Sequence, residues 1–238
     1  MAKKKVTEKP KFKTSATITK PDPARESARM KMVIKILRLE YPEAHCFLNH
    51  ESPFQLLIAT ILSAQCTDER INKTTPALFA KFPDAASMAK AKLSVLEKFI
   101  QSTGFFRAKA KSISETAKSL MEEYQGIVPQ TIDQLTRLRG VGRKTANVVL
   151  GNAFGIQSGV VVDTHVGRLA RRLGFTRHLD PVKVEMDLQK LVPKEDWTDF
   201  SHLLISHGRA ICTSRRAYCE ECALSKYCPK IGVENDRV

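Results

Sequence analysis

Apolar residues along most of the chain recur at the three- and four-residue spacing of amphipathic helices. The pattern is clear at Met30, Val33, Ile34 and Leu37, and the one extended apolar run is short, at 160–162. Sustained period-two alternation, which would indicate strands, is missing from the sequence. The pattern therefore predicts an all-α fold of roughly ten short helices joined by short loops.

Local signals mark where several of these helices begin and end. A capping side chain followed by proline is a helix start signal. Such pairs occur at Ser52-Pro53, Thr75-Pro76 and Asp180-Pro181. Glycines that favour helix stops occur at Gly104, Gly126 and Gly174.

The net charge of the chain indicates what kind of molecule it binds. The 238 residues include 39 Lys and Arg against 25 Asp and Glu, for a net charge of +14. Residues 1–22 carry five of these charges, so nine belong to the rest of the chain, and a basic tail on a neutral domain does not account for them. A polyanion such as nucleic acid is the expected partner.

The segments outside the helical pattern carry further expectations. We expect residues 1–24 to form a disordered basic tail and 231–238 a C-terminal tail. Apolar stretches fall short of the ~20 residues that span a bilayer, and no secretion signal precedes the helices. In a bacterium the protein is expected in the cytoplasm, associated with the nucleoid. In a eukaryote it is expected in the nucleus or the mitochondrion.

Two glycines, Gly140 and Gly142, flank Val141 between the end of one helix and the start of another. Glycine permits a turn that leaves the N–H groups of the next helix free for a phosphate. On its own this pattern is more often a simple connector. The basic neighbours Arg139 and Arg143 favour a helix-hairpin-helix that binds DNA phosphates.

Two polar residues near this turn are candidates for catalysis. Lys144 lies in the first turn of the second helix, where the positive end of the helix dipole favours the neutral amine that a Schiff-base nucleophile needs. Asp163 follows the apolar run 160–162 and precedes another predicted helix. Capping that helix is the ordinary role for such a residue, and assisting a nearby nucleophile is the alternative.

Four cysteines crowd together near the C-terminus, whereas Cys46 and Cys66 lie far upstream. This distribution favours metal binding over three disulfides. The four are separated by six, two and five residues: Cys212, Cys219, Cys222 and Cys228. Zinc sites usually show two close pairs, so a 4Fe-4S cluster fits better. Nearby arginines are expected to contact DNA: Arg209, Arg215 and Arg216.

The hairpin 138–144, the segment 162–165 and the cysteine loop together resemble the endonuclease III family of helix-hairpin-helix DNA glycosylases. Further similar text lies at 54–68 and 145–150. The resemblance implies a bifunctional DNA glycosylase and abasic-site lyase that removes damaged pyrimidines from duplex DNA as a monomer. It also implies a six-helix barrel domain at 46–156 and a cluster domain from 25–45 and 157–230.

The resemblance assigns roles to single residues. Lys144 would attack the sugar, Asp163 would assist, and Gln65 would fill the gap left by the flipped base. Phe105 stands where relatives place an apolar wedge, although a core position is the alternative. Arg139 replaces the usual hairpin proline, which would make the loop less rigid.

Two rivals remain at the level of sequence. A mismatch-specific adenine glycosylase resembles this chain in hairpin and cysteines, but such proteins carry a small hydroxyl residue in place of Lys144 and a long C-terminal extension. A non-catalytic DNA-binding module is the other rival. The presence of both Lys144 and Asp163 argues against it.

Overall fold

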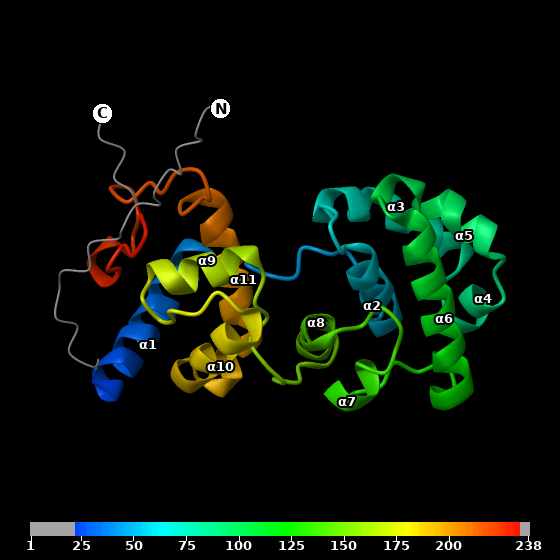
Figure 1. Ribbon diagram of the computed structural model, residues 1–238, viewed down its shortest axis with the longest axis horizontal. Coiled ribbons are helices and arrows are strands. Elements are labelled where there is room, and N and C mark those ends of the chain that lie inside the picture. The colour runs from blue at the N-terminus through cyan, green and yellow to red at the C-terminus, as the bar shows by residue number, and fades with distance from the viewer. Residues whose placement is uncertain (1–21, 234–238) are drawn as a thin grey trace, which may run out of the picture.

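A computed structural model describes residues 22–233, and the regular secondary structure of this part of the chain is helical (Figure 1). The predicted all-α class is confirmed, since the described residues contain no strand and only an isolated bridge between Cys212 and Ala217. The α-helices are α1 (Pro23–Glu40), α2 (Pro53–Leu62), α3 (Asp68–Lys81), α4 (Ala85–Ala89), α5 (Leu93–Ile100), α6 (Phe106–Tyr124), α7 (Ile132–Leu135), α8 (Arg143–Phe154), α9 (Thr164–Arg172), α10 (Pro181–Leu191) and α11 (Trp197–Ala210). Short 3-10 turns are η1 (Gln101–Thr103), η2 (Lys194–Asp196) and η3 (Ser225–Tyr227).

Two of the three predicted helix starts are confirmed. The Ser52 side chain accepts a hydrogen bond from the Gln55 amide at the start of α2, and Asp180 caps α10 in the same way. The start at Thr75 is wrong, because Thr75 and Pro76 lie inside α3, which Thr67 caps. Thr75 directs its hydroxyl to the Ile71 carbonyl one turn back, so its side chain serves the helix interior.

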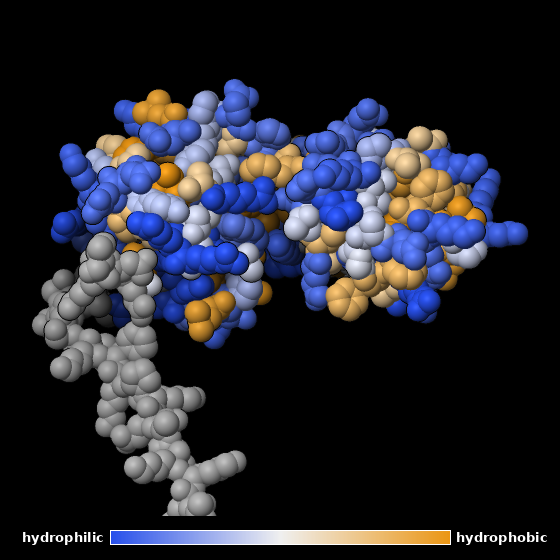
Figure 2. All heavy atoms as spheres, turned by 90° about the horizontal axis from the view of Figure 1, so that it is seen from above, coloured by the Kyte–Doolittle hydropathy of each residue, from blue (hydrophilic) through white to orange (hydrophobic). Residues whose placement is uncertain are grey.

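The helices gather into two lobes, each with a hydrophobic core of its own. The first lobe contains α2 to α8, and the second contains α1, α9, α10, α11 and the C-terminal loop (Figure 1). The space-filling view shows a narrower waist between them (Figure 2). Because α1 precedes the first lobe in the chain and packs on α10 and α11, the second lobe is built from both ends of the described sequence.

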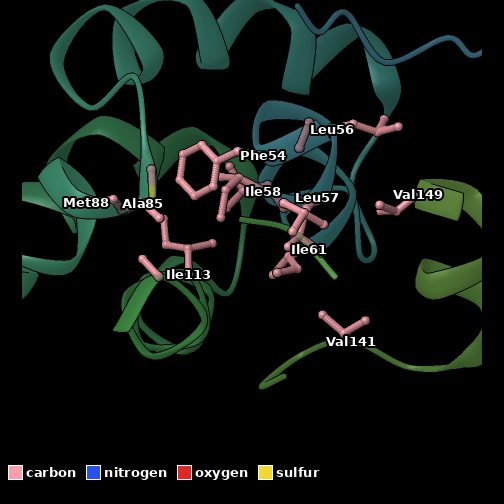
Figure 3. Close-up of a cluster of buried hydrophobic side chains, with 14 of the residues drawn as sticks. Phe54, Leu56, Leu57, Ile58, Ile61, Ala85, Met88, Ile113, Val141 and Val149 are labelled. Atoms are coloured by element: carbon pink, nitrogen blue, oxygen red, sulfur yellow. The ribbon is translucent and has the colours of Figure 1, made fainter. Parts of the chain in front are cut away.

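The core of the first lobe surrounds α2. Eight residues of this helix are buried, from Phe54 to Leu62, which explains its continuous apolar run. Figure 3 shows that Val141 and Val149 join the same cluster as Ile61, with the Val141 side chain turned toward it. The hairpin is therefore anchored in the core of the first lobe.

The ends of the described chain differ from the predicted tails. Most of the predicted tail at 1–24 lies outside the described residues, but α1 already begins at Pro23, with Asp22 as its N-cap. At the other end, Ile231 donates a backbone hydrogen bond to the Arg172 carbonyl. In the described range, no helix combines the length and the apolar character that crossing a membrane requires.

Candidate functional site

The turn between α7 and α8 depends on Gly140. This residue has a φ of +78°, and a Cβ atom there would lie 3.2 Å from the Ser112 Cβ. The side chain of Val141 is buried, and its amide bonds the Leu138 carbonyl at 3.1 Å. Thr116 on α6 donates a hydrogen bond to the Arg139 carbonyl at 2.8 Å. The turn is thus fixed from both sides.

The N-terminus of α8 is left open for a ligand. Gly142 is the N-cap residue and supplies no capping side chain, and a Cβ atom at this position would meet nothing within 4 Å. The first amides of α8 lack a side-chain partner, so they can bind an anion. Lys144 is exposed in this same first turn.

Arg143 faces the second lobe. Its Nε and Nη2 each donate to the Glu185 carboxylate of α10 at 3.0 Å, and this carboxylate is buried. The ion pair and its hydrogen bonds raise the pKa of Arg143 against the opposing effect of burial. Asn147 donates to the same carboxylate at 3.0 Å. Arg143 therefore ties the hairpin helix to α10, and its predicted phosphate contact stays a prediction.

Asp163 is the N-cap of α9. Its Oδ1 accepts a hydrogen bond from the Val166 amide at 2.8 Å. The capping role expected for an Asp at this position is confirmed, and its second carboxylate oxygen is not used by that bond. The segment 160–162 before it is buried and has no regular secondary structure.

Gln65 and Phe105 share an uncommon backbone. Both are exposed and both have positive φ values, +54° and +45°, which are costly for residues other than glycine. The Phe105 side chain is 70% exposed, so the alternative that it belongs to the core is wrong. Strained, exposed residues of this kind concentrate at functional sites.

The arginines that were predicted to contact DNA differ in whether they form an ion pair with a neighbouring carboxylate. Arg209 pairs with Asp68 at 2.6 Å and lies 4.1 Å from the centre of the Phe47 ring. Arg139 pairs with Glu115 at 2.9 Å on the surface. Arg215 and Arg216 are exposed, and Arg216 lies over the Tyr218 ring.

The four clustered cysteines line one cavity in the second lobe, together with apolar side chains such as Leu169 and Leu224. All six cysteines of the chain lie in the described part, and none forms a disulfide. Burial raises the pKa of the Cys222 and Cys228 thiols, so their thiolates require a compensating cation.

The four cysteines supply the donor set that an iron-sulfur cluster requires. Among the described residues, no three His, Cys, Asp or Glu side chains stand close enough to bind one metal ion. In a 4Fe-4S cubane each thiolate binds a different iron, so the sulfurs surround a body larger than one zinc. Four cysteines around one apolar cavity fit that requirement.

Two side-chain nitrogens lie within hydrogen-bond distance of cysteine sulfurs. Arg172 Nη1 lies 3.2 Å from the Cys212 Sγ, and His207 Nε2 lies 3.4 Å from the Cys222 Sγ. The other ring nitrogen of His207 lies 2.9 Å from the Tyr41 hydroxyl. Burial lowers the pKa of His207 to about 4, so at neutral pH the ring is uncharged and donates through one nitrogen only.

Sequence reasoning missed Glu185, His207 and Arg172, because their partners lie far away along the chain. A buried lysine, Lys109, was also missed, although the sequence contains a signal for it. Lys109 shares the apolar face of α6 with Ile113, so a charge at helical spacing on a buried face was visible.

Comparison with known proteins agrees with this geometry. A family described as HhH-GPD superfamily base excision DNA repair protein matches residues 58–194. Endonuclease III of Synechocystis sp. is 52% identical over 206 residues, which cover 87% of this chain and 94% of that protein. Endonuclease III of Escherichia coli K12 is 39% identical over 201 residues, covering 84% and 95%.

A solved structure of similar fold is a trapped covalent intermediate of endonuclease III with DNA. Its TM-score is 0.81 at 41% identity, and the match covers 86% of this chain and 96% of that one. The predicted fold class and family are confirmed. The chain therefore belongs to the endonuclease III family within the HhH-GPD superfamily of base excision DNA repair proteins.

Proposed function

We propose that this protein is a bifunctional DNA glycosylase and abasic-site lyase that removes damaged pyrimidines from duplex DNA. The observation that carries the proposal is the exposed Lys144 in the first turn of α8, directly behind an open helix N-terminus. Phosphate binding at that terminus would bring the sugar next to the amine. A similar endonuclease III has been trapped in covalent linkage with DNA, which supports a nucleophile on the protein.

The proposed chemistry uses the Lys144 amine as the nucleophile. The Nζ adds to C1′ of the sugar, and the bonding pair of the glycosidic bond leaves with the base, which takes up a proton. The C1′–O4′ bond then breaks as a proton passes from the nitrogen to O4′, which opens the sugar ring and leaves a protonated imine. Loss of a C2′ proton then breaks the C3′–O bond, the 3′ phosphate leaves, and the strand is nicked.

Asp163 is proposed to assist this step while it caps α9. One carboxylate oxygen is bonded to the Val166 amide, and the other remains for a proton or for positive charge on the sugar. The capping bond holds the carboxylate in a fixed orientation. A fixed charge of this kind needs no reorganisation when the reaction occurs.

The exposed left-handed residues Gln65 and Phe105 are proposed to enter the base stack. Extruding a nucleotide costs a few kcal/mol and leaves a gap that an inserted side chain can fill. Gln65 offers an amide for the vacated position, and Phe105 offers an apolar ring. DNA would approach through the hairpin amides and the exposed Arg215 and Arg216, without base-specific contacts.

The four cysteines of the cavity are proposed to hold a 4Fe-4S cluster. Cys212, Cys219, Cys222 and Cys228 would be the ligands, with Arg172 and His207 donating toward two of the sulfurs. When bound, the cluster would supply a structural crosslink for the C-terminal loop. Arg215 and Arg216 lie on this loop, so the crosslink would also place cations at the DNA.

The two hydrophobic clusters support the proposed domains, 46–156 and the pair 25–45 with 157–230. A monomer is sufficient for the proposed reaction, because one chain contributes every residue named above. The protein would act wherever the cell keeps its DNA.

The test is a cleavage assay on a duplex with one oxidised pyrimidine. Wild type should release the base and nick the strand, whereas Lys144→Ala should do neither at a comparable rate. Lys183→Ala is the matched control, since Lys183 is an exposed lysine in the first turn of α10. Binding without base release by wild type would instead favour a non-catalytic DNA-binding module.

A further inference from the structure

Lys109 is a buried cation on α6. Lys109 is only 6% exposed, and its Nζ donates a hydrogen bond to the Thr103 carbonyl at 2.7 Å. In the described chain no carboxylate pairs with this amine. Burial lowers the pKa of Lys109. Burying a charged amine costs free energy, so the group that this amine binds needs an explanation.

The bond holds the loop that carries Phe105. Gly104 has a φ of +68° and a ψ of 153°, a conformation that is essentially restricted to glycine. Phe105 follows in the left-handed region, with a φ of +45°. Two successive residues with positive φ persist only when their surroundings fix them.

Lys109 fixes this loop on both sides of Gly104. Its Nζ holds the Thr103 carbonyl just before the glycine, and its backbone amide bonds the Phe105 carbonyl just after it at 3.1 Å. The loop is also tied to α3, where Thr74 and Ser102 join their hydroxyls at 3.0 Å. Phe105 itself remains 70% exposed.

We propose that Lys109 is a positioning residue, which presents Phe105 to the DNA by holding the strained Thr103–Phe105 loop. This inference rests on the proposed insertion of Phe105 into the base stack. Without the Nζ bond the loop relaxes, the ring leaves its position, and damaged nucleotides are extruded less often. Contacts with phosphates in undamaged DNA do not involve this loop and are unchanged.

The test uses Lys109→Met, Phe105→Ala and the double variant in the full chain. Lys109→Met keeps an unbranched side chain in the core but removes the N–H donors. Each single variant should lower the single-turnover excision rate about 10- to 100-fold, as a small misplacement near a reacting group does. Binding to undamaged duplex should stay within about two-fold of wild type, because it depends on phosphate contacts.

The double variant distinguishes positioning from a general structural role. If Lys109 acts through Phe105, the double variant should be no slower than Phe105→Ala alone. A loss in the double variant equal to the product of the two single losses would overturn the inference. A wild-type rate for Lys109→Met would overturn it as well. An unchanged rate for Phe105→Ala would overturn both the proposed wedge role of Phe105 and this inference. The proposed function would still hold if cleavage depended on Lys144.

A second perturbation covers the case in which Lys109→Met unfolds. Gly104→Ala strains the same loop from its backbone, and the added Cβ would meet nothing within 4 Å. The comparison variant is Gly155→Ala, where φ is also positive at +67° and the added Cβ likewise meets nothing within 4 Å. Gly104→Ala should reduce excision and base unstacking, reported by 2-aminopurine fluorescence beside the lesion. Equal effects of the two glycine variants would contradict the inference.

Discussion

Removing the Glu185 carboxylate is expected to weaken the contact between the two lobes. This carboxylate on α10 accepts two hydrogen bonds from Arg143 and one from Asn147, all at 3.0 Å. The substitution Glu185→Ala removes both carboxylate oxygens that accept these bonds. The amide nitrogen of Asn147, a residue only 2% exposed, would then be buried without a partner.

The size of the effect follows from exposure. The Glu185 side chain is 7% exposed, but the Arg143 side chain is 46% exposed and regains water when the pair is broken. Bonds to charged groups contribute about 1.5–3 kcal/mol each, and a buried unpaired amide costs about 1–3 kcal/mol. Allowing for the hydration of Arg143, we expect Glu185→Ala to lose about 3 kcal/mol of stability.

Calorimetry checks this expectation against a matched surface carboxylate. A loss of about 3 kcal/mol lowers the Tm of a chain of this size by roughly 6–12 °C. Glu115 pairs with Arg139, but the two side chains are 39% and 50% exposed. Glu115→Ala should therefore lose only about 0–1 kcal/mol. Equal melting shifts for the two variants would refute the assignment of a special role to the buried carboxylate.

Three further predictions concern separate parts of the molecule. Asp163→Asn keeps a capping side chain, so its Tm should match wild type while excision slows; Asp163→Ala should also lose about 0.5–2 kcal/mol of stability in denaturant titrations. Protein purified without oxygen should be yellow-brown and contain about four irons per chain, and metal analysis showing one zinc would contradict this. Burial lowers the pKa of His202 below its ordinary value of about 6.5, so the unfolded chain binds this proton first as the pH falls. The Tm should fall when the pH is lowered from 7.5 to 5.5, and it should fall less in His202→Gln. Equal changes in Tm for the two proteins would show that His202 does not contribute to this pH dependence.

The sequence predicted features whose causes are local. The capping bonds at Ser52 and Asp180 involve residues three positions apart, and the turn at Gly140 depends on backbone freedom. Asp163 was recognised as a cap for the same reason. Local competition also explains the failure at Thr75: threonine before proline signals a start, but Thr67 eight residues earlier caps a helix that continues through Pro76.

Features that depend on distant partners escaped prediction. Arg143 was expected to face DNA, and nothing near it in sequence indicates that Glu185, on another helix, receives its guanidinium. The same holds for Arg209 and its partner Asp68 across the waist between the lobes. Pairings of this kind become visible only when the chain is folded.

The most direct test of the account is borohydride trapping on a duplex with one oxidised pyrimidine. Borohydride reduces an imine to a stable amine, so it links protein to DNA only if a lysine has attacked the sugar. Wild type should give the covalent product, and Lys144→Ala should give none while still binding the duplex. Trapping of Lys144→Ala at the wild-type yield would show that another amine is the nucleophile and would contradict the account.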